Sequence, residues 1–310
     1  MEARIHFRAF FLPMLPDLPA WALPILFSSL TLGLYNFSVK QSVQDNAVVP
    51  VVFFSTLCGT GTFLLWSLLT GQFCAFATCT AAEFFLIVLK SLIVAASWLL
   101  GYYGMRELPL SIAVPIRATA PLWTFLGGLI FFSEVPTLLQ SIGMICVFGG
   151  YYAFSVLGQK EGISFRRHRG LHFIILGMLL GAGSALYDKY LLNIRGVNRN
   201  SVQFWFSILL VVIFGLILLY RNLFCEKHHA FRWRWWIPAT GILLIVADYL
   251  YFHAVSIPDA RISVLSLIRR SGCVVAFTAG VLFYHEKNIR AKALALALIL
   301  LGVALLLLFK

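Results

Sequence analysis

The chain has 310 residues, of which 61% are hydrophobic and 12% are charged, and its formal net charge is +12. Soluble domains carry about 45–50% apolar and about 25% charged residues, so this composition excludes a soluble globular protein. The basic residues lie in short loops between apolar runs, which excludes a nucleic-acid partner and fits contact with membrane lipids.

The apolar runs predict an all-α integral membrane protein. Residues 1–21 are broken by prolines and show no small-residue cleavage site, so we expect a short N-terminal lead-in outside the membrane. A spanning helix needs about 20 mostly apolar residues. Ten segments meet this requirement: 22–40, 47–69, 82–104, 109–132, 137–157, 171–192, 201–222, 234–255, 259–283 and 290–309.

An internal repeat organises these segments. At a constant offset of 152 residues the two halves align without a gap, and IRATAPLWTFLGGLIFFSE (116–134) falls on IRRSGCVVAFTAGVLFYHE (268–286). We predict two five-helix repeats, 22–157 and 171–310, joined by the basic loop 158–170. Because five is odd, the second repeat enters the membrane from the opposite side, as in many secondary transporters.

The repeated motif also resembles a known family. An apolar run is followed by Pro121 and Leu122, a glycine-rich stretch and Glu134, and then by Gln140 and Gly143. This pattern resembles the EamA-type repeat of the drug/metabolite transporter superfamily. The second repeat is similar, with Glu286, Lys292 and Gly302, but it has Cys273 where the first has Pro121. The resemblance implies ten helices, two inverted halves, a central cavity and transport of small metabolites.

Two arginines occupy equivalent positions inside predicted spans. A charge at the centre of a membrane helix costs about 2.5–3.5 kcal/mol, so it needs a partner or water. At a rise of 1.5 Å per residue, Arg117 and Arg269 lie about 12 and 15 Å inside their helices. We expect both to face the central cavity and bind an anionic group of the substrate. The alternative is a pair of purely structural ion pairs. The neighbouring Arg270 is expected to pair with Asp188 or Asp248.

Polar aromatic residues cluster in the same spans. Tyr35, Asn36, Trp98, Tyr187 and Tyr251 are candidate substrate contacts, because such side chains offer an apolar face and a polar tip. The alternative for each aromatic residue is packing or an interfacial belt.

Three further charges lie within the spans. Asp188 and Asp248 are candidate coupling groups, since a carboxylate in an apolar site can take up a proton in a useful pH range. Lys90 lies deep in the third span, and we expect its stem to reach toward the membrane surface. Glu134 and Glu286 close the fourth and ninth spans and are expected to form structural hydrogen bonds at helix ends.

Several motifs of other functions are missing. The sequence contains no GxxxxGK[ST], HExxH or GxSxG motif, so we expect no catalytic residues and no cofactor. His168 and His172 have the spacing of two metal ligands, but no third ligand is evident, and we expect no metal. An intramembrane enzyme acting on a lipid-linked substrate and a channel are the alternatives to a transporter.

Together these features predict a secondary transporter, an exporter or exchanger, that moves a small metabolite by alternating access. The expected partners are the substrate, membrane lipids and protons as coupling ion. We expect a multi-pass protein of the cell membrane, the cytoplasmic membrane of a bacterium. Most Lys and Arg residues follow the fifth, seventh and ninth spans, which places both termini outside by the positive-inside rule. The resemblance implies both termini inside, and both orientations stay open here.

Overall fold

The structure is a computed structural model that describes residues 19–44, 46–107, 120–158, 169–224, 230–272, 275 and 289–308. All regular elements within these residues are helices. They are α2 (Ala22–Val43), α3 (Val48–Leu69), α4 (Phe73–Ala77), α5 (Ala81–Glu107), α7 (Ala120–Phe132), α8 (Leu138–Gly158), α9 (Arg169–Lys189), the π-helix η1 (Tyr190–Ile194), α10 (Arg199–Phe224), α11 (Trp236–Val255), α12 (Ile262–Arg270) and α14 (Ile289–Leu308).

The prediction of an all-helical, multi-pass membrane protein is confirmed. Six helices among the described residues are long and apolar enough to cross a bilayer: α2, α3, α5, α9 with η1, α10 and α11. In hydrocarbon every backbone polar group must be paired within its own segment, so an apolar run of this length is stable only as a helix. Three shorter apolar helices lie at 120–132, 138–150 and 293–302. The short helix α4 and the π-helix η1 were not predicted.

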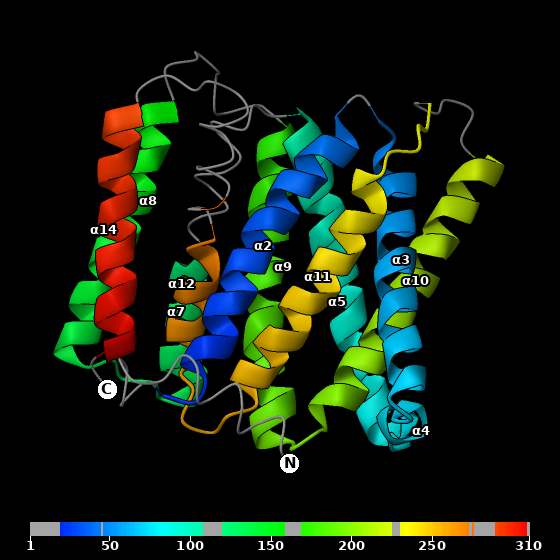
Figure 1. The fold of residues 1–310 in the computed structure, drawn as a ribbon, viewed down its shortest axis with the longest axis horizontal. Coiled ribbons are helices and arrows are strands. Elements are labelled where there is room, and N and C mark those ends of the chain that lie inside the picture. The colour runs from blue at the N-terminus through cyan, green and yellow to red at the C-terminus, as the bar shows by residue number, and fades with distance from the viewer. Residues whose placement is uncertain are drawn as a thin grey trace.

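The helices pack across the two halves of the sequence. In Figure 1, α8 and α14 lie side by side at one edge of the bundle, and α3 and α10 lie at the opposite edge. Between them, α2 packs along α11, and α5 packs along α9. The start of α2 and the end of α14 lie at the same end of the bundle, the lower end in Figure 1. Each long helix of the first half therefore has its main neighbour in the second half.

Small polar residues join α2 to α11. The Ser28 hydroxyl donates to the carbonyl of Ala247 at 2.7 Å. Almost three helical turns further along the same interface, the Ser38 hydroxyl lies 2.8 Å from that of Thr240. Because lipid tails are as apolar as the helices, packing of small residues and interhelical hydrogen bonds hold such bundles together.

The crossing of α3 and α11 brings two glycine backbones together. A Cβ placed on Gly59 would lie 2.8 Å from the carbonyl carbon of Gly241, and one placed on Gly241 would collide with the carbonyl oxygen of Ser55. No side chain fits between the two helices at this point. Gly61, on the same helix as Gly59, has open space around its position.

Glu134 connects the end of α7 to the start of α12. The chain leaves α7 through Ser133, whose φ is 51°. The Glu134 carboxylate then accepts hydrogen bonds from the backbone N–H groups of Ile262 (3.0 Å) and Ser263 (3.3 Å) and from the Ser263 hydroxyl (2.7 Å). The expected role of Glu134 in a helix-end hydrogen bond is thus confirmed, although the helix that it caps is a distant one.

Glu134 also forms an ion pair with Lys189, the last residue of α9. Burial alone would raise the pKa of Glu134, but the hydrogen bonds from Lys189 and Ser263, the charge of Lys189 and the Ile262 N–H together lower it below its ordinary value. The carboxylate is therefore ionised at neutral pH, which lets it hold α7, α9 and α12 together.

The glycine contact yields a matched test of the fold. We expect Gly59→Ala to lower the melting temperature of the purified protein, because the added methyl group forces α3 and α11 apart. Gly61→Ala should leave it unchanged or raise it slightly, since alanine favours a helix by about 0.5–1 kcal/mol over glycine. Thermal unfolding in detergent measures both, and equal effects of the two substitutions would contradict the close crossing.

Candidate functional site

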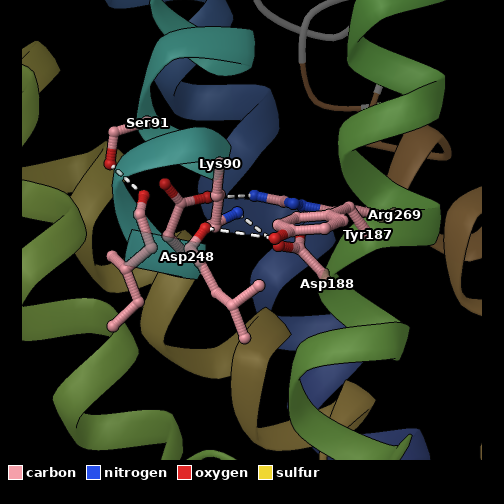
Figure 2. A network of polar contacts seen from close by, with 8 residues as sticks. Lys90, Ser91, Tyr187, Asp188, Asp248 and Arg269 are labelled. Carbon is pink, nitrogen blue, oxygen red and sulfur yellow. Dashed lines mark hydrogen bonds and ion pairs between the residues drawn. The ribbon is translucent and has the colours of Figure 1, made fainter. Parts of the chain in front are cut away.

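Four charged side chains meet inside the bundle as two ion pairs. Lys90 of α5 pairs with Asp188 of α9, and Arg269 of α12 pairs with Asp248 of α11. Figure 2 shows both pairs side by side, with Tyr187 next to them. Lys90 is 2% exposed and Asp188 4%. The four charges cancel, which makes the cluster tolerable in a medium of low dielectric constant.

Aromatic rings surround the two cations. The Lys90 ammonium lies 4.4 Å from the ring centroid of Phe206 and 4.8 Å from that of Phe252. The Arg269 guanidinium lies 4.0 Å above the ring of Tyr251. Cation–π contacts of this kind contribute about 2 kcal/mol or more when the cation is desolvated. The rings therefore supply part of the stabilisation that water would otherwise give.

Two polar groups at the cluster lack a hydrogen-bond partner among the described residues. One is the hydroxyl of Tyr251, and the other is Nε of Arg269. Buried polar groups are nearly always paired. Unpaired donors beside a charge cluster are the groups that a bound ligand or an ordered water could satisfy.

The end of α9 explains how adjacent residues reach different partners. Asp188 points to α5, whereas Lys189 points to Glu134 and donates to the carbonyl of Ala260 at 3.2 Å. Adjacent helical residues point about 100° apart, so they contact different neighbours. Immediately after them the helix changes into η1, and such π-helical turns occur frequently at functional sites.

The structure brings five of the predicted site residues together with Lys90. These are Asp188, Asp248, Arg269, Tyr251 and Tyr187, and the Tyr187 hydroxyl donates to the carbonyl of Leu86 at 3.3 Å. Arg117 lies outside the described residues.

Three other candidates lie elsewhere. The Tyr35 hydroxyl lies 3.0 Å from that of Tyr102, and the Trp98 ring stacks on Phe214 at 6.1 Å. Asn36 is exposed on α2.

Two expectations about the charges were wrong. Arg269, rather than Arg270, pairs with Asp248. Glu134 holds the start of α12 through Ile262 and Ser263, and in this orientation Arg269 reaches Asp248 of α11. Lys90 was expected to reach the membrane surface, but it is buried and paired. Its position, about 14 Å along α5, was the available signal, since a lysine so deep needs a carboxylate nearby.

A small cavity opens near the cluster, at the end of the bundle that carries α4. It has a volume of about 270 Å³ and is lined by Thr80, Ala82, Glu83, Leu86, Ile194, Arg195 and Val197. Leu86 lies one helical turn before Lys90 and accepts the hydrogen bond of Tyr187. The cavity therefore ends one turn short of the Lys90–Asp188 pair.

Paired charges buried among long apolar helices define a polytopic membrane protein with an intramembrane polar site. Residues 19–156 match a family model described as the EamA-like transporter family. This match covers the first repeat, and it supports the EamA resemblance seen in the sequence and a membrane transporter of the drug/metabolite transporter type.

Two further comparisons concern whole chains. No curated protein matches this sequence. A solved structure described only as the crystal structure of a protein is similar over 93% of this chain and 98% of its own, with a TM-score of 0.75 and 14% sequence identity. At this identity the likeness shows the fold alone, and it extends over both halves of the chain.

The Lys90–Asp188 pair can be tested by a pairwise substitution. We expect Lys90→Met to destabilise the protein by about 3–5 kcal/mol, because it leaves Asp188 charged and unpaired in the apolar interior. The double variant K90M/D188N should recover most of this loss, since no charge remains. Denaturation of the purified variants measures both effects. Additive losses in the double variant would show that the two side chains do not interact.

Proposed function

We propose that the protein is a secondary transporter that moves a small metabolite with an anionic group by alternating access between two inverted halves. The observation that carries this proposal is the buried, charge-neutral cluster formed by Lys90, Asp188, Asp248 and Arg269. It joins helix α5 of the first half to α9, α11 and α12 of the second. A movement that separates α5 from α9 must break the Lys90–Asp188 pair, which is the pair of the cluster that joins the halves.

The pattern of helix packing supports the inverted repeat. At the 152-residue offset, α2 corresponds to α9, and α5 corresponds to α11. The interface of α2 with α11 therefore corresponds to the interface of α9 with α5, and these are the two long central interfaces of the bundle. The contacts of α3 with α11 and of α10 with α5 correspond in the same way. A pseudo-two-fold axis between the halves accounts for all four interfaces.

Arg269 is the group that would receive the substrate anion. Its side chain is 19% exposed, the most accessible of the four, and its Nε has no hydrogen-bond partner among the described residues. The planar guanidinium offers five donors that match a carboxylate or phosphate. A substrate anion would displace Asp248 from Arg269, while Tyr251 would keep the guanidinium in place from its other face.

The two carboxylates would couple this step to protons. When a substrate anion takes Arg269, Asp248 is left as an unpaired charge in an apolar site, and it is then neutralised most readily by a proton. Protonation of Asp188 would remove the partner of Lys90. An unpaired ammonium requires water, so this step favours separation of α5 from α9 and opening between the halves.

For the direction of transport and the membrane in which the protein lies, we keep the expectations from the sequence. We infer an exporter or exchanger in the cytoplasmic membrane of a bacterium. The short inter-helix segments and the buried cluster are suited to a rocking movement of one half against the other, which alternates access to a site at mid-depth.

A ligand screen with a matched arginine variant tests the anion site. We expect a subset of carboxylates or phosphates to raise the melting temperature of the detergent-purified wild type, and Arg269→Gln to abolish this shift. A ligand at 100 times its dissociation constant stabilises the folded state by about 2.7 kcal/mol, which is readily measured.

Arg199→Gln is the control for this screen, because Arg199 lies at the start of α10, away from the cluster. It should keep the full ligand-induced shift. Stabilisation by anions that persists in Arg269→Gln would refute the assignment, as would stabilisation by cations alone.

Proton coupling is tested in proteoliposomes with a ligand identified by the screen. In the wild type, an imposed pH gradient should change the rate of uptake. We expect Asp248→Asn and K90M/D188N to make uptake independent of the gradient, because each variant lacks one of the two carboxylates that the proposed coupling needs. Normal, gradient-driven transport by both variants would exclude coupling through these residues.

A further inference from the structure

The segment before α11 is unusual in its chemistry. Residues 231–236, FRWRWW, alternate arginine with large aromatic residues and lie at the end of the bundle opposite the start of α2, the upper end in Figure 1. We propose that this segment, here called the Arg–Trp segment, is a binding site for the phosphate headgroup of an anionic phospholipid. The site is separate from the buried charge cluster and does not depend on the proposed function.

The Arg–Trp segment is held rigidly although only its last residue, Trp236, belongs to a helix. Asn46, in the α2–α3 connection, donates from Nδ2 to the backbone carbonyl of Arg232 at 2.8 Å. The backbone N–H of Arg232 donates back to Oδ1 of Asn46 at 2.9 Å. This reciprocal pair fixes the backbone without using the guanidinium, which leaves the Arg232 side chain exposed.

Aromatic contacts fix the other face of the segment. Phe231 stacks on Phe54 of α3 with ring centroids 5.2 Å apart, and Trp233 meets the same ring edge-on at 5.8 Å. At the start of α11, Trp236 packs edge-on against Phe37 of α2 at 5.5 Å. The segment is thus fastened to α2 and α3, so its shape exists before any ligand binds.

The remaining surface has the composition of a lipid headgroup site. The Trp235 side chain is 82% exposed and Trp233 is 50% exposed. Exposed tryptophan rings at the end of a spanning helix take positions at the level of the headgroups. Arg232 and Arg234 lie between them in the sequence, and a guanidinium binds a phosphate through two parallel hydrogen bonds. Arg234 uses Nη1 for the carbonyl of Gln41, at 2.8 Å, and its other donors are available to a phosphate.

Charge and location together favour a lipid over a soluble anion. Residues 221–236 contain four basic residues, Arg221, Lys227, Arg232 and Arg234, against one acidic residue, Glu226. The aromatic side chains beside the arginines require an apolar phase, and a free phosphate supplies none. A diacyl phospholipid with a net negative charge supplies both, whereas a zwitterionic one does not supply the net charge.

The experiment uses the full chain in lipid nanodiscs made of phosphatidylcholine alone or with one quarter phosphatidylglycerol of the same acyl chains. We expect phosphatidylglycerol to raise the melting temperature of the wild type by several degrees, and native mass spectrometry to detect retained phosphatidylglycerol molecules. Both effects should be lost in R232Q/R234Q. The control R195Q/R199Q removes the same charge at the opposite end of the bundle and should keep both effects.

Further variants distinguish binding at this site from a general effect of positive charge. R232K/R234K keeps the charge but lacks the planar guanidinium groups that form two parallel hydrogen bonds with a phosphate. It should retain the lipid more weakly than the wild type. If R232Q/R234Q does not fold, Arg232→Gln alone serves, because that side chain is exposed. Equal retention of phosphatidylglycerol by R232Q/R234Q and wild type would overturn the proposal. So would equal losses in the control at the opposite end, or displacement of the lipid by inorganic phosphate.

Discussion

The pairing of buried charge governs the architecture of this protein. A lysine and an aspartate that are almost fully enclosed among apolar helices can both stay ionised only while they remain in contact. That requirement fixes the rotation of α5 and α9 and leaves Lys189 pointing toward Glu134. Glu134 in turn positions α12, and α12 carries Arg269 to Asp248. Three ion pairs thus form a chain of constraints from one side of the bundle to the other.

Only one of the four charges in the cluster follows the repeat. At the 152-residue offset, Arg269 corresponds to Arg117, but Asp188 corresponds to Asn36, Asp248 to Ala96, and Lys90 to Ile242. Both ion pairs of the cluster therefore include a charge that the other repeat lacks. Hydroxyl groups bonded to the backbone occur at both equivalent interfaces, from Ser28 to Ala247 between α2 and α11 and from Ser97 to Gly177 between α5 and α9. The α5–α9 interface adds the ion pair of Lys90 with Asp188.

Much of the fold was accessible from the sequence because hydropathy alone decides where a membrane helix forms. The candidate charged residues could also be predicted from the sequence, since an ionisable residue within a membrane span is costly and usually has a functional or structural partner. The partners were not. Whether Arg269 or Arg270 faces Asp248 depends on where α12 starts, and a shift of one residue turns a helix by about 100°. The role of Lys90 depends on which helix faces α5, and the linear order of segments does not specify that.

The local structure at the end of α9 was beyond prediction for a different reason. A π-helical turn differs from an α-helical one by a small change in hydrogen bonding, and the sequence YLLNI gives no sign of it. The π-helical turn lies between two constraints. Asp188 and Lys189 make tertiary contacts before it, and the turn at residues 195–198 follows it.

The glycine crossing of α3 and α11 has a mechanical meaning. Where Gly59 meets Gly241, the two helices touch through their backbones, and no side chains interlock across the contact. Interlocked side chains resist sliding because each must change rotamer, whereas two smooth backbones can roll over one another with little rearrangement. In the proposed rocking motion of the halves, α3 and α11 would turn against each other at this crossing, where no side chains have to change rotamer.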